Sequence, residues 1–244
     1  MKLIPLAAAL AVVGGAVTFI PGPSDGRPAP LAPPSIAAEA PVLVELFTSQ
    51  GCSSCPPADA LAEQLAEEPG LVVISRPVTY WDRLGWKDTL AREENTDLQR
   101  AYAAKGLGGR NGVYTPQIVV DGARGVVGSD EPRVRRMIEA ERGAAATLDI
   151  AGETVTITGE GAHDAQLVLV DLNAHAVVHI VRGENSRRSI GYTNVVTDER
   201  VLADWSGGTA EVALPASKAA GIDRQALILR EKAAGRVLAA RMIG

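Results

Sequence analysis

Two cysteines separated by two residues follow a short apolar segment and precede a helical pattern. This arrangement constrains the fold more than any other feature of the chain. The apolar segment spans residues 42–47, and the cysteines are Cys52 and Cys55. A strand, a short loop and a helix N-terminus would place both thiols where free N–H groups and partial positive charge favour a thiolate. The sequence therefore predicts thiol–disulfide chemistry, without indicating a substrate.

Two other roles for the cysteine pair stay open at this point. The spacing is half of many zinc sites, but the chain has only these two cysteines to offer. An inert disulfide is the other alternative, although closing so short a loop stabilises a fold by only about 2 kcal/mol. We therefore expect a redox-active disulfide, and we expect neither a resident metal nor another cofactor.

The net charge of the chain bears on its possible partners. The net charge of the 244 residues is −5, with no basic stripe, which argues against nucleic acid as a partner.

We predict that residues 1–20 are a signal peptide or an N-terminal anchor, because Lys2 precedes an almost unbroken apolar segment; a buried helix of a soluble protein is the alternative. Residues 21–40, rich in Pro and Ala, are expected to be a linker.

Export would place the cysteine pair in an oxidising compartment, where a disulfide is its resting state. We expect a periplasmic or secreted protein, either free or tethered to the inner membrane through residues 3–20.

The order of elements after the linker is the next constraint. Apolar periodicity and turn residues predict an alternation of strands and helices. The first two strands, joined by a helix, should be parallel, whereas Asp121 and Gly122 indicate an antiparallel hairpin. The expected strands are residues 42–47, 71–74, 117–120 and 125–128, and the expected helices are residues 58–68, 90–104 and 129–143.

This order, with the cysteines opening the first helix and Thr115-Pro116 before the third strand, resembles the thioredoxin fold. The resemblance implies that the Thr115-Pro116 bond is cis and that Pro116 lies against the cysteines. More narrowly, the chain is similar to a family of uncharacterised, exported bacterial thioredoxin-like proteins, a domain of unknown function. The similar segments are residues 48–59, 80–82, 85–88, 113–117, 182–185 and 194–196. Pro77 and Thr79 stand where family members carry His and Asp, so any proton transfer by that His is absent here.

Three residues are expected to carry the chemistry. Cys52 should be the exposed, attacking thiol, and Cys55, one turn into the helix, the buried resolving thiol. Glu45 lies in the middle of an apolar strand. If it is buried without a cationic partner, its pKa would be raised and it could exchange a proton with Cys55. The alternative is a glutamate at a strand edge that local hydrogen bonds satisfy.

A substrate groove is expected beside the cysteines. Thr115 and Pro116 could pair an extended substrate segment through the backbone of Thr115, and Tyr80, Trp81 and Trp86 could frame the groove. Packing of these aromatic side chains in a small core is the alternative reading.

The C-terminal half shows a different pattern. Alternating and β-branched segments separated by Gly, Asn and Asp predict a small antiparallel β domain, like a sandwich. His175 and His179 fall in one such segment, where strand spacing would hold the two rings about 13 Å apart, too far to share a metal ion. Residues 215–221 are expected to form a short helix or an ordered loop.

The predicted fold class is therefore α/β: a thioredoxin-like domain at residues 41–145 followed by an antiparallel β-rich, sandwich-like domain at residues 146–244. The predicted function is exchange of disulfides with the thiols or disulfides of other exported proteins, or with a membrane redox partner. One alternative is a binding module without exchange activity, such as a carrier of a soft metal like copper on two thiolates. The other is a structural protein with an inert disulfide.

Overall fold

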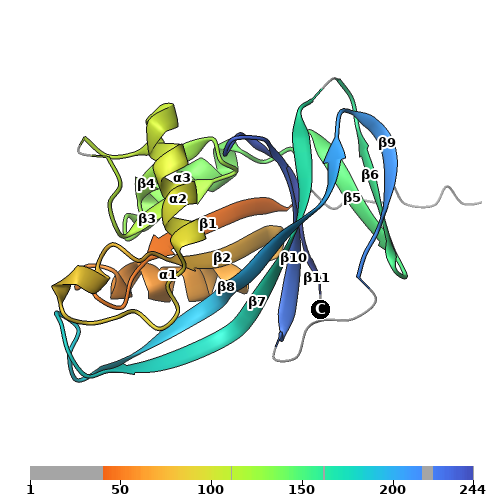
Figure 1. Ribbon diagram of the computed structural model, residues 1–244. Coiled ribbons are helices and arrows are strands. Elements are labelled where there is room, and N and C mark those ends of the chain that lie inside the picture. The colour runs from red at the N-terminus through yellow and green to blue at the C-terminus, as the bar shows by residue number, and fades with distance from the viewer. Residues whose placement is uncertain (1–40, 111, 162, 216–221, 244) are drawn as a thin grey trace, which may run out of the picture. The chain divides into compact units, whose positions relative to one another are not determined.

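The computed structural model describes residues 41–110, 112–161, 163–215 and 222–243 (Figure 1). The predicted signal peptide or anchor, the predicted linker and most of the 215–221 segment lie outside these described residues. In the described ranges, every helix is too short or too polar to cross a membrane.

Strands dominate the described residues, with 47% in strands against 20% in helices. Local sequence explains several boundaries: Pro56 and Pro57 occupy the first turn of the first helix, where a missing N–H is tolerated, and the Asp130 side chain caps the third helix by accepting the Arg133 N–H. In chain order the elements are β1 (Val42–Thr48), α1 (Pro56–Ala66), β2 (Leu71–Pro77), η1 (Asp82–Leu84), α2 (Glu93–Tyr102), η2 (Ala103–Leu107), β3 (Gln117–Val120), β4 (Arg124–Val127), α3 (Glu131–Ala140), β5 (Ala146–Ala151), β6 (Thr154–Gly159), β7 (Ala165–Ile180), β8 (Arg188–Trp205), β9 (Gly208–Ala213), β10 (Arg224–Glu231) and β11 (Val237–Ile243).

A mixed, eight-stranded sheet organises the fold, in the order β11-β10-β7-β8-β2-β1-β3-β4. β1 pairs with β2 in parallel, and β3 pairs with β4 in antiparallel, as predicted. β8 then joins β2 in parallel at Ser75 and Val195, and this pairing continues the sheet into the C-terminal half. A second sheet contains β5, β6 and β9.

The predicted fold class is wrong. The finding that overturns it is the large sheet itself: strands from both sides of residue 145 share it, and the molecule is β-rich with few helices, not a thioredoxin-like α/β domain followed by a separate sandwich. In Figure 1, the long β7–β8 hairpin runs alongside β2 and ends next to the loop before α1. Separate folding of residues 41–145 and 146–244 stays a prediction.

The physical reason lies in how the two faces of β1 and β2 are covered. Side chains alternate along a strand, so Val44 and Leu46 face α1 and α3, whereas Leu43 faces the opposite way. An α/β fold would cover that second face with helices. Here Leu43 and Ile74 pack against apolar residues of β7, β8, β10 and β11.

Candidate functional site

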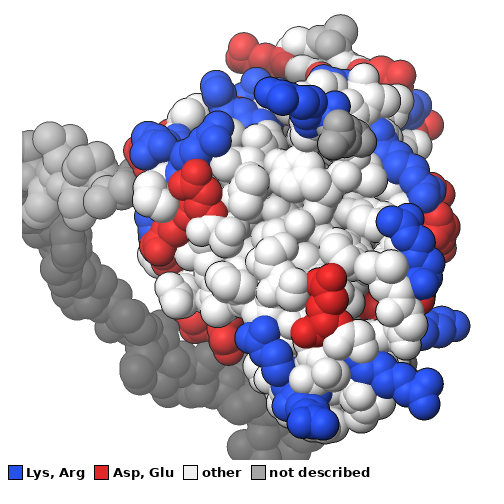
Figure 2. All heavy atoms as spheres, turned by 90° about the vertical axis from the view of Figure 1, so that its left-hand side faces the viewer, with Lys and Arg blue, Asp and Glu red and all other residues white. Residues whose placement is uncertain are grey.

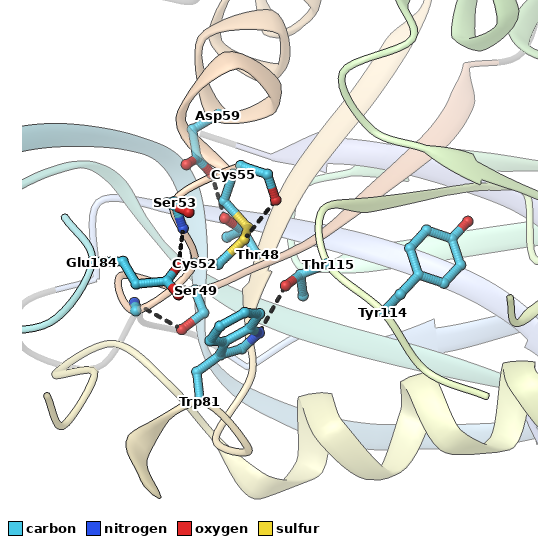
Figure 3. Close-up of a disulfide and its surroundings, with 12 residues drawn as sticks. Thr48, Ser49, Cys52, Ser53, Cys55, Asp59, Trp81, Tyr114, Thr115 and Glu184 are labelled. Carbon is cyan, nitrogen blue, oxygen red and sulfur yellow. Dashed lines mark hydrogen bonds between the residues drawn. A yellow bond between two sulfur atoms is a disulfide. The ribbon is translucent and has the colours of Figure 1, made fainter. Parts of the chain in front are cut away.

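Cys52 and Cys55 form a disulfide where β1 leads into α1, with their Cα atoms 5.4 Å apart (Figure 3). Cys55 is the N-cap residue of α1, and its carbonyl oxygen accepts the backbone N–H groups of Ala58 and Asp59. The sulfur pair therefore lies at the positive end of a helix dipole, where a released thiolate is stabilised. The predicted disulfide is confirmed.

Both cysteines are fully buried, at 0% exposure, so the expectation of an exposed Cys52 is wrong. The cover comes from the hairpin tip, defined here as residues 181–187 between β7 and β8. Asn185 Nδ2 donates to the carbonyl oxygens of Gln50 at 3.0 Å and Cys52 at 2.8 Å. The Glu184 carboxylate accepts the Ser53 N–H at 3.0 Å. Because both cysteines are fully buried, the cysteine loop or a segment bonded to it must move before a reactant reaches the sulfur atoms, and the hairpin tip is one such segment.

Trp86 holds the cysteine loop instead of lining a groove. Its indole N–H donates to Gln50 Oε1 at 2.9 Å, and its ring packs beside Ile180 and Tyr192. Asp88 holds the same loop by accepting the Gln50 N–H at 2.8 Å. For Trp86, the structure thus shows the packing role that was the alternative to a groove.

Tyr80, Trp81 and Thr115 do come together, in the lining of a groove of about 490 Å³. Trp81 Nε1 donates to Thr115 Oγ1 at 2.8 Å, and in Figure 3 the Trp81 ring lies between the cysteine loop and Thr115. The Thr115-Pro116 bond is cis, which confirms that expectation. Pro116 lies close to the first turn of α1, with Gly128 in contact with both. A Cβ atom added at Gly128 would be 3.1 Å from the Cβ atom of Ala58 and 3.3 Å from the Cβ atom of Pro116.

Glu45 does not meet the condition for proton exchange. Its carboxylate is fully buried but accepts from Arg76 Nε at 2.7 Å, Arg230 Nη2 at 2.6 Å and the Tyr102 hydroxyl at 2.6 Å. Burial favours the neutral acid, but the charges of Arg230 and Arg76 outweigh it and lower the pKa of Glu45 to about 2. The condition for a raised pKa, burial without a cationic partner, is therefore not met, and Glu45 holds no proton near neutral pH.

Asp59 is the ionisable residue that the sequence analysis missed. It follows Cys55 by one helical turn and is only 4% exposed. Oδ1 accepts the Thr48 hydroxyl at 2.7 Å, and Oδ2 has no hydrogen-bond partner among the described residues. Burial raises the pKa of Asp59 to about 7. The signal in the sequence was the four-residue spacing from Cys55, which places both side chains on one face of a helix.

The Tyr192 hydroxyl shares this setting. It is buried and likewise has no hydrogen-bond partner within the described part of the chain. Burial raises the pKa of Tyr192, and the nearby charges of Asp59 and Asp88 raise it further. Buried polar groups are rarely left unpaired, so the unpaired Tyr192 hydroxyl and the unpaired Asp59 Oδ2 make this a candidate functional position.

Metal ligation has little structural basis in the described ranges, where no three His, Cys, Asp or Glu side chains are grouped to hold an ion. His175 and His179 are exposed on β7, as the strand reading of that segment predicts.

Comparison with known proteins adds a family and a fold. The family described as "Protein of unknown function (DUF1223)" matches residues 43–230. The crystal structure of a protein from Agrobacterium tumefaciens is 33% identical, with a TM-score of 0.71, and the match covers 85% of this chain and 96% of that one. HBP35 of Porphyromonas gingivalis is 14% identical, with a TM-score of 0.54, over 84% of this chain and 75% of its own. No curated protein matches.

Proposed function

The chain belongs to the DUF1223 family of proteins of unknown function, and from that premise we propose that it is a thiol–disulfide exchange protein acting through Cys52 and Cys55. The observation that carries the proposal is the disulfide at the N-terminus of α1 with the buried Asp59 carboxyl one turn beyond it. An inert disulfide gains nothing from a carboxyl group whose pKa is about 7.

The exchange begins when the hairpin tip moves away from the cysteine loop. A substrate thiolate attacks Cys52 Sγ; a mixed disulfide forms and the Cys52–Cys55 bond breaks. Cys55 leaves as a thiolate at the helix N-terminus and takes the proton that Asp59 holds. A second substrate thiolate then attacks the substrate sulfur of the mixed disulfide and releases the Cys52 thiolate. Two electrons have passed from a substrate dithiol to the cysteine pair, and the reverse sequence reduces a substrate disulfide.

The site of action follows from the expected export signal in residues 1–20. Our proposal is that the protein works outside the cytoplasm, on cysteines of other exported proteins, and that a partner disulfide or a membrane redox protein restores its own disulfide. Thr115, next to the cis bond, and Trp81 would contact the substrate at the near end of the groove.

The reduction potential of the Cys52–Cys55 pair tests this proposal, measured by equilibration with dithiothreitol or glutathione and alkylation of free thiols. We expect a value between about −270 and −120 mV, the range of exchange proteins. We also expect Cys55→Ala, whose Cys52 thiolate attacks a substrate disulfide but has no resolving partner, to accumulate a mixed disulfide with a disulfide-bonded peptide. Cys52→Ala, the matched control, should accumulate much less.

A potential well below about −300 mV, or no trapped complex, would mean a structural disulfide and end the proposal. Tight binding of Cu(I) by the reduced protein without exchange would support the metal-carrier alternative instead.

A further inference from the structure

The groove that Trp81 separates from the cysteine loop in Figure 3 extends further than the residues predicted from the sequence. Its near part, lined by Tyr80, Trp81 and Thr115, also has Arg83 and Arg100 in its wall. A second hollow of about 390 Å³ shares Val113 and Tyr114 with the first. The second hollow is also lined by Arg110, Val127 and Arg133. The two hollows are therefore adjacent parts of one surface, called here the long groove.

The charge of the long groove differs from that of the whole chain. The chain carries a net charge of −5, yet four exposed arginines line this one groove. Arg100 binds Glu93 and Asp97, and Arg133 lies 4.0 Å from Asp130.

Arg83 and Arg110, by contrast, form no ion pair within the described residues. Figure 2 views the side that carries η1 and the 107–115 loop, where a broad uncharged area is bordered mainly by Lys and Arg side chains, with Asp and Glu side chains at one edge and within its lower part. Positive charge around an uncharged, hollowed surface attracts and orients anionic partners.

The groove wall also offers backbone groups to a ligand. Among the described residues, the N–H groups of Tyr114 and Thr115 and the carbonyl oxygen of Thr115 take part in no hydrogen bond. Both residues are only partly buried. Unpaired backbone groups in an extended segment are suited to pairing with an extended peptide.

We propose that the long groove binds an extended, acidic segment of the substrate protein. Its backbone would pair with Tyr114 and Thr115, its carboxylates would lie against Arg83 and Arg110, and its cysteine would reach the Cys52–Cys55 pair. This inference rests on the proposed exchange function and names the substrate class for the same site. Apolar side chains of the segment would fill the hollows beside Trp81 and Val127.

Three peptides with one dithiol core and acidic, neutral or basic flanks test the inference. The readout is the rate of peptide oxidation by the full-length protein, first at low and then at raised ionic strength. We expect the second-order rate constant for a single oxidation by the disulfide form of the protein to be about tenfold larger for the acidic peptide than for the neutral one at low salt, and the difference to shrink as salt is added.

Charge reversal then locates the effect. Arg83→Glu and Arg110→Glu should each remove most of the preference for the acidic peptide, measured as the ratio of the rate constants for the acidic and the neutral peptide. Arg136→Glu is the matched control, because Arg136 is exposed on α3, lines neither hollow and makes no ion pair in the described part of the chain. Circular dichroism tests whether each variant is folded. If Arg83→Glu does not fold, Arg83→Gln replaces it in the same measurement.

The outcomes separate the two proposals. Wild-type protein that oxidises none of the peptides contradicts the exchange function itself. Equal rates with all three peptides leave exchange standing but overturn the acidic substrate class. If Arg136→Glu lowers the preference as much as Arg83→Glu does, net charge is responsible and the long groove is not the binding site.

Discussion

At the scale of single residues, Asp59 is the group whose charge should change near neutral pH. Its pKa is about 7 in the folded protein against an ordinary value of 3.8, because burial disfavours the charged form. Between these two pH values the folded state binds more protons than the unfolded state. The contribution of Asp59 to stability is therefore lost as pH rises through this window.

Asp59→Asn removes this dependence while keeping an oxygen that can accept the Thr48 hydroxyl. We expect the variant to be more stable than the wild type at pH 8, by at most about 4 kcal/mol, and nearly equal to it at pH 4. Urea unfolding of the oxidised proteins at both pH values measures this difference. A constant difference across the range would show that Asp59 does not titrate there.

The same substitution should alter exchange in a way that a structural effect would not. The exchange rate of the wild type is expected to show an inflection near pH 7 that is absent from Asp59→Asn, because the proton for Cys55 is lost. An unchanged pH profile, in a variant whose rate is merely lower, would assign Asp59 a packing role.

At the scale of elements, the hairpin tip controls access to the disulfide. The Asn185 side chain donates two hydrogen bonds to backbone carbonyl oxygens of the cysteine loop. Arg188 Nη1 donates in turn to Oδ1 of Asn185 at 3.0 Å. Hydrogen bonds of this kind contribute about 1 kcal/mol each to the closed arrangement.

Asn185→Ala should therefore open the tip more often and raise the rate of disulfide reduction by dithiothreitol about tenfold. Stopped-flow measurement of thiol release gives this rate. Val177→Ala, exposed on the same hairpin and away from the tip, should react like the wild type. Equal rates for all three proteins would mean that tip opening does not limit the reaction.

Sequence patterns predicted short elements better than long ones. β3 was placed at the correct residues, because the three apolar residues that follow Gln117, between Pro116 and Asp121, leave little choice. Residues 166–172 and 176–181 were expected to be separate segments; in the structure β7 continues from one into the other, and Asn173 between them pairs with Val195 of β8. β8 was not predicted, and within this strand Asn194 has a positive φ of 48°. Partner strands, not local preference, keep both segments extended.

Only part of the site was predicted, because some of its contacts are local in the sequence and others are not. The cysteine pair and the cis bond depend on neighbours in the sequence, and the residues Tyr80, Trp81 and Thr115 were expected together. The cover on Cys52 and the partners of Glu45 depend on contacts across 133 and 185 residues, which one sequence does not reveal.

At the scale of the whole molecule, one buried ionic cluster joins distant strands. Arg76 of β2 binds Glu45 of β1 and Glu199 of β8, each at 2.7 Å, and Arg230 of β10 binds Glu45 at 2.6 Å. The cluster links the N-terminal strands to β8 and β10, so its loss should loosen both halves together.

Glu45→Gln leaves Arg76 and Arg230 buried and short of negative charge. We expect a loss of about 3–5 kcal/mol in the free energy of unfolding at pH 7, measured by urea denaturation. The exposed Glu93→Gln, which breaks an ion pair with Arg100, is the control and should change little. A similar small loss for both variants would mean that the cluster is not a net source of stability.

The ionisation of Glu45 also determines how the stability of the protein changes at acidic pH. The folded pKa of Glu45, about 2, lies below its ordinary value of 4.5. Its stabilising contribution is thus complete above pH 4.5 and is lost as pH falls toward 2, so the difference between wild type and Glu45→Gln should narrow on acidification.

The hairpin tip holds the cysteine loop through the loop's main chain, at the N–H of Ser53 and the carbonyl oxygens of Gln50 and Cys52, and the Ser53 side chain adds a hydrogen bond to Glu184. The Ser54 side chain is exposed and takes no part in these bonds; its hydroxyl oxygen lies 3.4 Å from Cys52 Sγ. Residue 54 can therefore change, and with it the redox potential, without weakening the closure. Selection can adjust how strongly the pair oxidises and how often it is accessible as two independent properties.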